Sequence, residues 1–460
     1  MRPNNAKHFL TIEKLFTSPF SLLASGFSLL AFSSYRFLLL SLLASTFLLF
    51  NSCNTTEPPP PKPEKPKLIE LKEITKSCTE TFIKVTVKDT ILPTTVKINR
   101  DGKEIMNYYQ TKTDTTIIDT GLAAAKTYLY KATIGNKEEE KSKELQVSTL
   151  PTTSNNFTWK TYIFGDFKYG SSELLDVAII DENDIWAVGE IYTDTTGQPY
   201  NAVHWDGNKW KLKRISVMYR DNLITTPLEG IFTFSKNDIW VTNGFPIHGN
   251  GNIWEMYHLQ DMGLSVSISK VWGQNSNDIY FVGRSGSIAH YNGTSWSKIE
   301  SGTTTNINDV WGIKDTTSGT SLILSTVSSR YQRGDYKFLS ISGNTAEKYF
   351  SWPYTRLYGV WFNSPQKIYI VGDGGYLYEN NKLNRIDLPT NSFLTRVKGT
   401  ELNNIFVAGC CNTLLHFNGV SWKAMQGIYG NYEGLDIKGN LVVAVGWTTN
   451  KALILLGTRQ

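Results

Sequence analysis

Short apolar runs interrupted by turn residues fill about two thirds of the sequence, from residue 155 onward. The stretch ISKVWGQNSNDIYFVGRSGSIAHYNGTSWSKIES divides at its turn residues into ISKVWG, DIYFVG, SIAHYNG and SWSKIE. Each piece is rich in β-branched or aromatic residues, which predicts four strands in an antiparallel meander. The pair Asn292–Gly293 between the last two pieces predicts a type I′ hairpin turn, because that turn needs positive φ at both central residues.

The second strand of this unit recurs along the chain, most clearly as NDIWAVG, NDIWVTNG, NDIYFVG and NNIFVAG. Seven copies align, and the copy near 305–350 departs most from the others. A repeat of about 40 to 50 residues is the length of one four-stranded propeller blade. The residues that align with Asp278 of the quoted copy are Asp184, Asp238, Ser321, Lys367, Asn404 and Leu441.

The two ends of the repeat region complement each other. The last copy supplies only YEGLDIKG, NLVVAVG and KALILLG, so it lacks a fourth strand. FTWKTYI at 157–163 precedes the first copy, and its Trp159 aligns with the tryptophans of the fourth strands, Trp210, Trp296 and Trp422. Pairing this strand into the last copy closes a ring and removes an exposed sheet edge. We therefore predict an all-β fold, with a seven-bladed β-propeller of four-stranded blades over residues 155–460.

The repeat is similar in architecture to those of kelch, WD40 and Asp-box propellers. A Trp-Asp pair of the WD40 kind occurs at Trp205–Asp206, the double glycine of kelch repeats occurs at Gly374–Gly375, and the Asp box is spelled out in no blade. The repeat resembles more the loosely defined DIWAVG…HYNG..W propellers of bacterial envelope proteins. That resemblance implies a propeller but no single activity.

Residues 1–53 are predicted to be an export signal. FLLLSLLASTFLLFNSC after Arg36 has the length of a signal-peptide apolar region, and its end resembles a bacterial lipobox with Cys53 as the lipidated residue. Phe50 stands where that motif usually has Leu. The alternative is a transmembrane anchor over about 20–50. The proline-rich residues 54–67 predict an extended spacer.

Residues 68–151 form a second region of alternating apolar and polar positions, which predicts a small Ig-like β-sandwich. Leu122, Tyr128 and Tyr130 resemble the L.....Y.Y segment of fibronectin type III domains, where the tyrosine fixes a corner of the fold. The tryptophan usual in the second strand of that family is absent here. The resemblance implies a spacer or binding module.

Composition limits the function classes. A formal net charge of +5 over 460 residues, without a basic stripe, argues against a nucleic-acid partner. No Cys/His spacing predicts a metal site, and no P-loop or Asp-x-Asp motif predicts a nucleotide, so we expect no cofactor. If Cys53 is lipidated, three cysteines remain. Cys410 and Cys411 are then either a strained vicinal disulfide or, as we expect, two thiols, beside Cys78.

The loops between second and third strands are expected to converge at one mouth of the propeller channel, where ligands tend to bind. Charged or aromatic residues in these loops form the predicted ligand site: Glu190, His248, Arg284, Arg330, Arg333, Asp373 and Trp447. The alternative is that these are solvated loop residues with no common ligand. Trp352 also falls in a predicted loop and is a further contact candidate.

Other aromatic and histidine positions recur from copy to copy, which favours a structural role over ligand contact. The recurring tryptophans, expected in the core, are Trp186, Trp240, Trp272, Trp311 and Trp361. The recurring histidines precede the hairpin turn at His204, His290 and His416.

The sequence therefore predicts a monomeric, lipid-anchored envelope protein, at the outer membrane or cell surface, that binds a glycan or a protein at the propeller mouth. A carbohydrate-active enzyme is the alternative, with Glu190 and Asp373 as the candidate catalytic carboxylates. A third possibility is a structural component of an envelope or secretion complex.

Overall fold

The structure is a computed structural model that describes residues 68–135, 141–314, 320–329, 335–350, 352, 355–427 and 429–460. The predicted signal with Cys53, the proline-rich spacer, Arg330 and Arg333 lie outside the described residues. Within the described ranges, no helix is long and apolar enough to cross a membrane.

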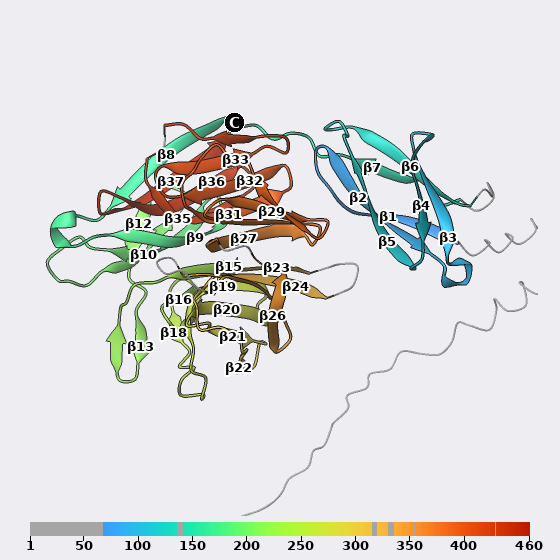
Figure 1. The fold of residues 1–460 in the computed structure, drawn as a ribbon. Helices are drawn as coiled ribbons and strands as arrows, with labels where there is room; N and C mark the ends of the chain where they lie inside the picture. Colours follow the sequence, from blue (N-terminus) through green and yellow to red (C-terminus); the bar gives the residue numbers. More distant parts are fainter. Residues whose placement is uncertain are drawn as a thin grey trace, which may run out of the picture. The chain divides into compact units, whose positions relative to one another are not determined.

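The amino-terminal part is a sandwich of two antiparallel sheets (Figure 1). Its core contains Val85, Ile98 and Tyr130, which point inward from facing strands. A short 3₁₀ helix, η1 (Asp89–Ile91), lies between β2 and β3. One sheet has the order β1 (Ile69–Lys76), β2 (Glu80–Val87) and β5 (Asp114–Thr120). The other has the order β4 (Lys103–Gln110), β3 (Thr94–Arg100), β6 (Thr127–Ile134) and β7 (Leu145–Ser148).

The remaining described residues form seven four-stranded antiparallel sheets. The first has the order β12 (Trp210–Lys213), β11 (Tyr200–Trp205), β10 (Asp184–Ile191) and β9 (Glu173–Asp181). The second runs from β15 (Gly230–Ser235) through β16 (Asp238–Thr242) and β17 (Pro246–Gly249) to β18 (Trp254–Met256). The third contains β19 (Ser267–Asn275), β20 (Asp278–Arg284), β21 (Ile288–Tyr291) and β22 (Trp296–Lys298). The fourth contains β23 (Ile307–Lys314), β24 (Ser321–Val327), β25 (Lys337–Ser342) and β26 (Thr345–Phe350).

The last three sheets repeat this meander. The fifth contains β27 (Leu357–Ser364), β28 (Lys367–Gly372), β29 (Gly375–Glu379) and β30 (Lys382–Ile386). The sixth contains β31 (Leu394–Glu401), β32 (Asn404–Gly409), β33 (Thr413–Phe417) and β34 (Trp422–Ala424). The seventh has the order β35 (Asn431–Lys438), β36 (Leu441–Thr448), β37 (Lys451–Arg459) and β8 (Phe157–Phe164). The helix η2 (Phe167–Tyr169) and the hairpin of β13 (Val217–Tyr219) and β14 (Asn222–Ile224) lie in connections.

The seventh sheet joins segments from both ends of this region. In Figure 1, β8 lies beside β37, and the two strands pair antiparallel along their length. Trp159 faces Gly457 in that register, and a Cβ at residue 457 would lie 2.2 Å from the indole ring. Gly457 therefore makes room for the aromatic ring of the incoming strand.

Packing between sheets follows the chain order. The first strand of each sheet contacts the first strand of the next, and β35 of the last sheet contacts β9 of the first. One apolar cluster includes Ile185 and Val203 of the first sheet together with Val443 and Ile454 of the seventh. The seven first strands thus line a shared space, which we call the axial channel.

In four of the seven sheets, the repeated sequence is explained by a polar contact between the first residue of the second strand and a histidine of the third strand. The seven second strands begin at the residues that the alignment marks. In the second sheet, Asp238 Oδ1 accepts a hydrogen bond from Trp240 Nε1 at 3.0 Å and lies 2.9 Å from His248 Nε2, while the histidine ring stacks on the indole. Equivalent stacked sets are Asp184, Trp186 and His204; Asp278, Tyr280 and His290; and Asn404, Phe406 and His416.

The predicted type I′ turn is wrong in its geometry. Gly293 has a positive φ of 90°, but Asn292 does not share it, and four residues separate β21 from β22. Asn292 Oδ1 instead accepts hydrogen bonds from the backbone N–H groups of Thr294 and Ser295, at 3.0 and 2.8 Å. The asparagine closes the turn through its side chain rather than through its backbone conformation.

Candidate functional site

One end of the axial channel opens into a cavity of about 280 Å³, which we call the mouth cavity. In or next to the first strand of each of the seven described sheets, at least one residue lines it. The lining is mostly polar, and it combines acids, bases and amides with one tyrosine. The polar members are Glu229, Ser269, Lys270, Arg284, Asn306, Asn308, Ser329, Tyr358, Arg396 and Glu433.

Several charges of the mouth cavity are fixed by direct partners. Arg284 donates from Nη2 to Glu229 Oε1 at 2.8 Å. Lys270 Nζ donates to Asp176 Oδ2 at 2.8 Å and to the Glu229 carbonyl oxygen at 2.9 Å. Burial raises the pKa of Glu229, although Arg284 and Lys270 oppose that effect. The result is a rigid, mixed-charge lining rather than a surface of one sign.

Four charged side chains from separate sheets meet in the channel, namely Asp176, Lys270, Asp309 and Arg396; we call them the ionic layer. Burial by itself would raise the pKa of Asp176, but Lys270 and Arg396 outweigh it and lower that pKa. The layer therefore contains two acids and two bases. Glycine permits the close packing around it, since a Cβ at Gly434 would lie 2.7 Å from the Asp176 Cα atom.

A second cavity of about 300 Å³, the inner cavity, lies on the other side of this layer. It shares Lys270 and Arg396 with the mouth cavity, so these two side chains separate the cavities. Its further charged and aromatic members are Phe232, Trp311, Lys398, Asp436 and Lys438. Asp436 Oδ2 accepts from the Ile179 N–H at 2.7 Å, and burial is the main cause that raises the pKa of Asp436 to about 6.

Of the predicted site residues, Arg284 lines the mouth cavity, whereas the other described ones do not. Glu190 is the next-to-last residue of β10 and accepts a hydrogen bond from the Tyr192 hydroxyl at 3.0 Å. His248 lies within β17 rather than in the preceding loop, in contact with Asp238. Trp447 lies within β36, paired with Asn431 and Ala452.

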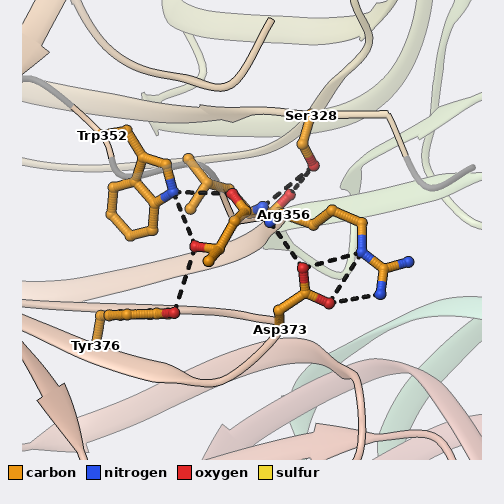
Figure 2. Close-up of polar contacts among 7 residues, drawn as sticks. Ser328, Trp352, Arg356, Asp373 and Tyr376 are labelled. Carbon is orange, nitrogen blue, oxygen red and sulfur yellow. Dashed lines mark hydrogen bonds and ion pairs between the residues drawn. The ribbon is translucent and has the colours of Figure 1, made fainter. Parts of the chain in front are cut away.

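Asp373 is held by a neighbouring arginine rather than facing the mouth cavity (Figure 2). Its carboxylate accepts from Arg356 Nε at 2.9 Å and from the Arg356 backbone N–H at 2.9 Å. Burial raises the pKa of Asp373, but these contacts with Arg356 outweigh it and lower the pKa. Asp373 therefore stays ionised, and its contacts with Arg356 connect the segment before β27 to the loop after β28.

Trp352 is buried, against the expectation of an exposed contact. Its ring packs beside Phe338, Phe350 and Tyr376, and its Nε1 donates to the Thr355 carbonyl oxygen at 2.9 Å (Figure 2). The recurring Trp186, Trp240, Trp272 and Trp361 are buried as expected. Trp311 is only half-buried, because it faces the inner cavity.

The sulfur atoms of Cys410 and Cys411 lie 3.2 Å apart, which is longer than a disulfide bond. Cys78 is buried. Among the residues that the structure describes, no group of three or more His, Cys, Asp or Glu side chains is arranged to hold a metal ion.

The predicted ligand site was drawn from the loops between second and third strands, so it did not include the charged residues of the first strands. Asp176, Lys270 and Arg396 stand at the same register position of their sheets, opposite the fifth residue of the second strand. The segments LLDVA and ISKVWG each place one charge inside a mostly apolar strand start, and LTRVKG places two. A charge inside a buried strand was the available signal for these residues.

No protein-family model matches the sequence, and no curated protein matches it. Among solved structures, the chain is similar to the WD40 β-propeller domain of Doa1, with a TM-score of 0.50 and 12% identity, covering 67% of this chain and 98% of that one. It is also similar to YCF48 bound to a D1 peptide, with a TM-score of 0.48 and 14% identity over 67% of this chain and 97% of that one. The fold is of the β-propeller type. This conclusion concerns the fold alone and rests on the first likeness together with the repeated sheets.

Proposed function

We propose that the chain is a lipid-anchored protein of a bacterial envelope, in which a seven-bladed propeller closed by β8 binds a protein partner at the mouth cavity. The observation that carries the binding role is the mouth cavity itself, where residues from all seven sheets converge and five of the sheets contribute a charge or an amide. Convergent polar groups in a concave site are the usual mark of a binding site.

The lining favours a protein over a glycan. Sugar rings stack on open aromatic faces, whereas Tyr358, the aromatic member of the lining, already packs edge-on against Phe393 at 5.4 Å. The Arg284–Glu229 ion pair lies in the lining of the mouth cavity and offers both hydrogen-bond donors and acceptors. A polar protein surface carries both kinds of group and can therefore complement this pair. A glycan remains the alternative ligand, to be separated by the test below.

The two carboxylates predicted for the enzyme alternative are both engaged by neighbouring side chains. Asp373 is held ionised by Arg356, and Glu190 accepts a hydrogen bond from Tyr192. A general acid at neutral pH needs a raised pKa, the opposite of the shift at Asp373. These contacts support a binding role for the propeller.

The sandwich fits a spacer module of the fibronectin type III kind. The hydroxyl oxygen of Tyr128 accepts a hydrogen bond from the Ala123 backbone N–H at 2.8 Å, the contact expected of a tyrosine corner. The proposed lipid on Cys53 and the proline-rich spacer would hold this module and a monomeric propeller away from the bilayer.

Photo-crosslinking in the native envelope tests the proposal. A crosslinking amino acid at Asn306, beside the mouth cavity, should give a discrete protein adduct that disappears when Glu229 and Arg284 are both replaced by Ala. The same amino acid at Lys382, on the outer strand β30, is the matched control and should give no such adduct. An adduct at Asn306 that survives the double substitution, or a glycan adduct, would contradict a protein site at the mouth.

A further inference from the structure

Two cations of the inner cavity lie on one strand. Arg396 and Lys398 are two residues apart on β31, so their side chains leave the same face of the strand. Both line the inner cavity, and the half-buried Trp311 lies beside them. This cavity is distinct from the mouth cavity to which the proposed function refers.

Neither cation has a direct anionic partner among the described residues. Arg396 is 3% exposed, and its one hydrogen bond within the described chain runs from Nη1 to the Thr395 carbonyl oxygen at 2.9 Å. Lys398 Nζ lies 3.9 Å from the centre of the Trp311 ring and forms no ion pair with a described residue. The other N–H groups of the Arg396 guanidinium are not among the described buried polar atoms without a partner, so they stay open to an acceptor in the cavities that Arg396 lines.

The nearby acids are already engaged elsewhere. Asp176 is paired with Lys270, and Asp309 Oδ2 accepts from the Val360 N–H at 3.1 Å. Burial alone would lower the pKa of Arg396, but Asp309 and Asp176 outweigh it and raise that pKa. The guanidinium thus stays charged, and its carbon lies 5.7 Å from the centre of the Tyr358 ring.

We propose that the inner cavity binds the carboxylate of a small organic acid between Arg396 and Lys398. A planar carboxylate matches the fork of guanidinium donors. The cavity lining carries four cations and three carboxylates. Its net charge of about +1 matches a single negative charge better than that of a phosphate dianion. The volume of about 300 Å³ accommodates a small ring, which would lie beside Trp311.

Titration calorimetry on the full-length protein, with benzoate and benzamide as probes, tests this site. Benzoate should bind at least about tenfold more tightly than its uncharged isostere benzamide, since a charge-assisted hydrogen bond is worth about that much. Lys398→Met should weaken the binding of benzoate by about tenfold. Lys382→Met, which removes an exposed lysine of β30, should leave that affinity unchanged. Equal affinity for the two probes, or an unchanged affinity of Lys398→Met, would overturn the proposal.

Crystals of the wild-type protein soaked in 4-bromobenzoate give a second readout that needs no variant. The anomalous signal of bromine should appear in the inner cavity, with the carboxylate at Arg396; bromine at other positions only would refute the site. This result is independent of the partner at the mouth. If the protein without the Glu229 and Arg284 substitutions gives no protein adduct at Asn306 but still binds benzoate, the proposed function alone is refuted. If it gives the adduct but does not bind benzoate, the carboxylate site alone is refuted.

Discussion

Replacing Asp238 by Ala should destabilise the propeller by about 2 to 4 kcal/mol. Asp238 Oδ1 accepts from Trp240 Nε1 at 3.0 Å and lies 2.9 Å from His248 Nε2. Trp240 is 2% exposed, so water cannot replace the lost acceptor. Leaving a buried donor unpaired costs about 1–3 kcal/mol, and the contact with His248 adds about 1 kcal/mol. Asp238→Asn keeps one acceptor oxygen and should cost less than half as much.

Urea denaturation followed by tryptophan fluorescence measures this change. All thirteen tryptophans lie after residue 155, so the signal reports on the propeller and not on the sandwich. The matched control is Asp261→Ala, an exposed carboxylate in the connection after β18, which should change the free energy of unfolding by less than about 0.5 kcal/mol.

A double-mutant cycle decides whether the hydrogen bond is responsible. Trp240→Phe removes the donor that Asp238→Ala leaves unpaired, so the double variant should cost at least about 1 kcal/mol less than the sum of the two single changes. Additive costs, or a cost of Asp238→Ala no larger than that of Asp261→Ala, would refute the structural explanation of the repeat.

Three further outcomes follow from buried groups. The pKa of Asp436 is raised from 3.8 to about 6, so stability should fall as pH rises from about 4 to 6, by about 3 kcal/mol; urea titrations of Asp436→Asn should show no such fall. Burial, with help from Arg459, lowers the pKa of His416 from 6.5 to about 3. Stability should therefore decline as pH drops below about 6.5, on the order of 4 kcal/mol by pH 3, and His416→Gln should decline less. Gly457→Val should lower the thermal midpoint, because its Cβ would meet the Trp159 ring, and a smaller loss in a Trp159→Ala background would confirm that cause; equal losses would contradict it.

The regular part of the fold was predictable because it repeats. Asp278 and its aligned residues mark the start of each second strand, since each copy must present the same apolar face to its neighbours. The pairing of Trp159 with the last sheet followed from the missing fourth strand. The turn at Asn292 was mispredicted, because dipeptide preference does not fix the loop length, which here leaves room for a side-chain cap.

The candidate site was less predictable. Arg284 followed from its place at the end of a second strand, and it does line the mouth cavity. His248 and Asp373 also fell at positions expected for a ligand site. Their side chains instead contact Asp238 and Arg356, and no local sequence pattern predicts these tertiary contacts. Arg396 was not predicted, because the predicted ligand site consisted of loop residues, whereas the first strands line the axial channel.

The pairing of β8 with β37 has a consequence for biosynthesis. These partners are separated by almost the whole propeller sequence, so β8 leaves the ribosome long before the strand that completes it exists. During that interval the backbone N–H and C=O groups of β8 lack their strand partner. Such unpaired groups can form hydrogen bonds with other nascent chains and lead to aggregation. The pairing of β8 into its sheet therefore has to wait until translation has passed β37.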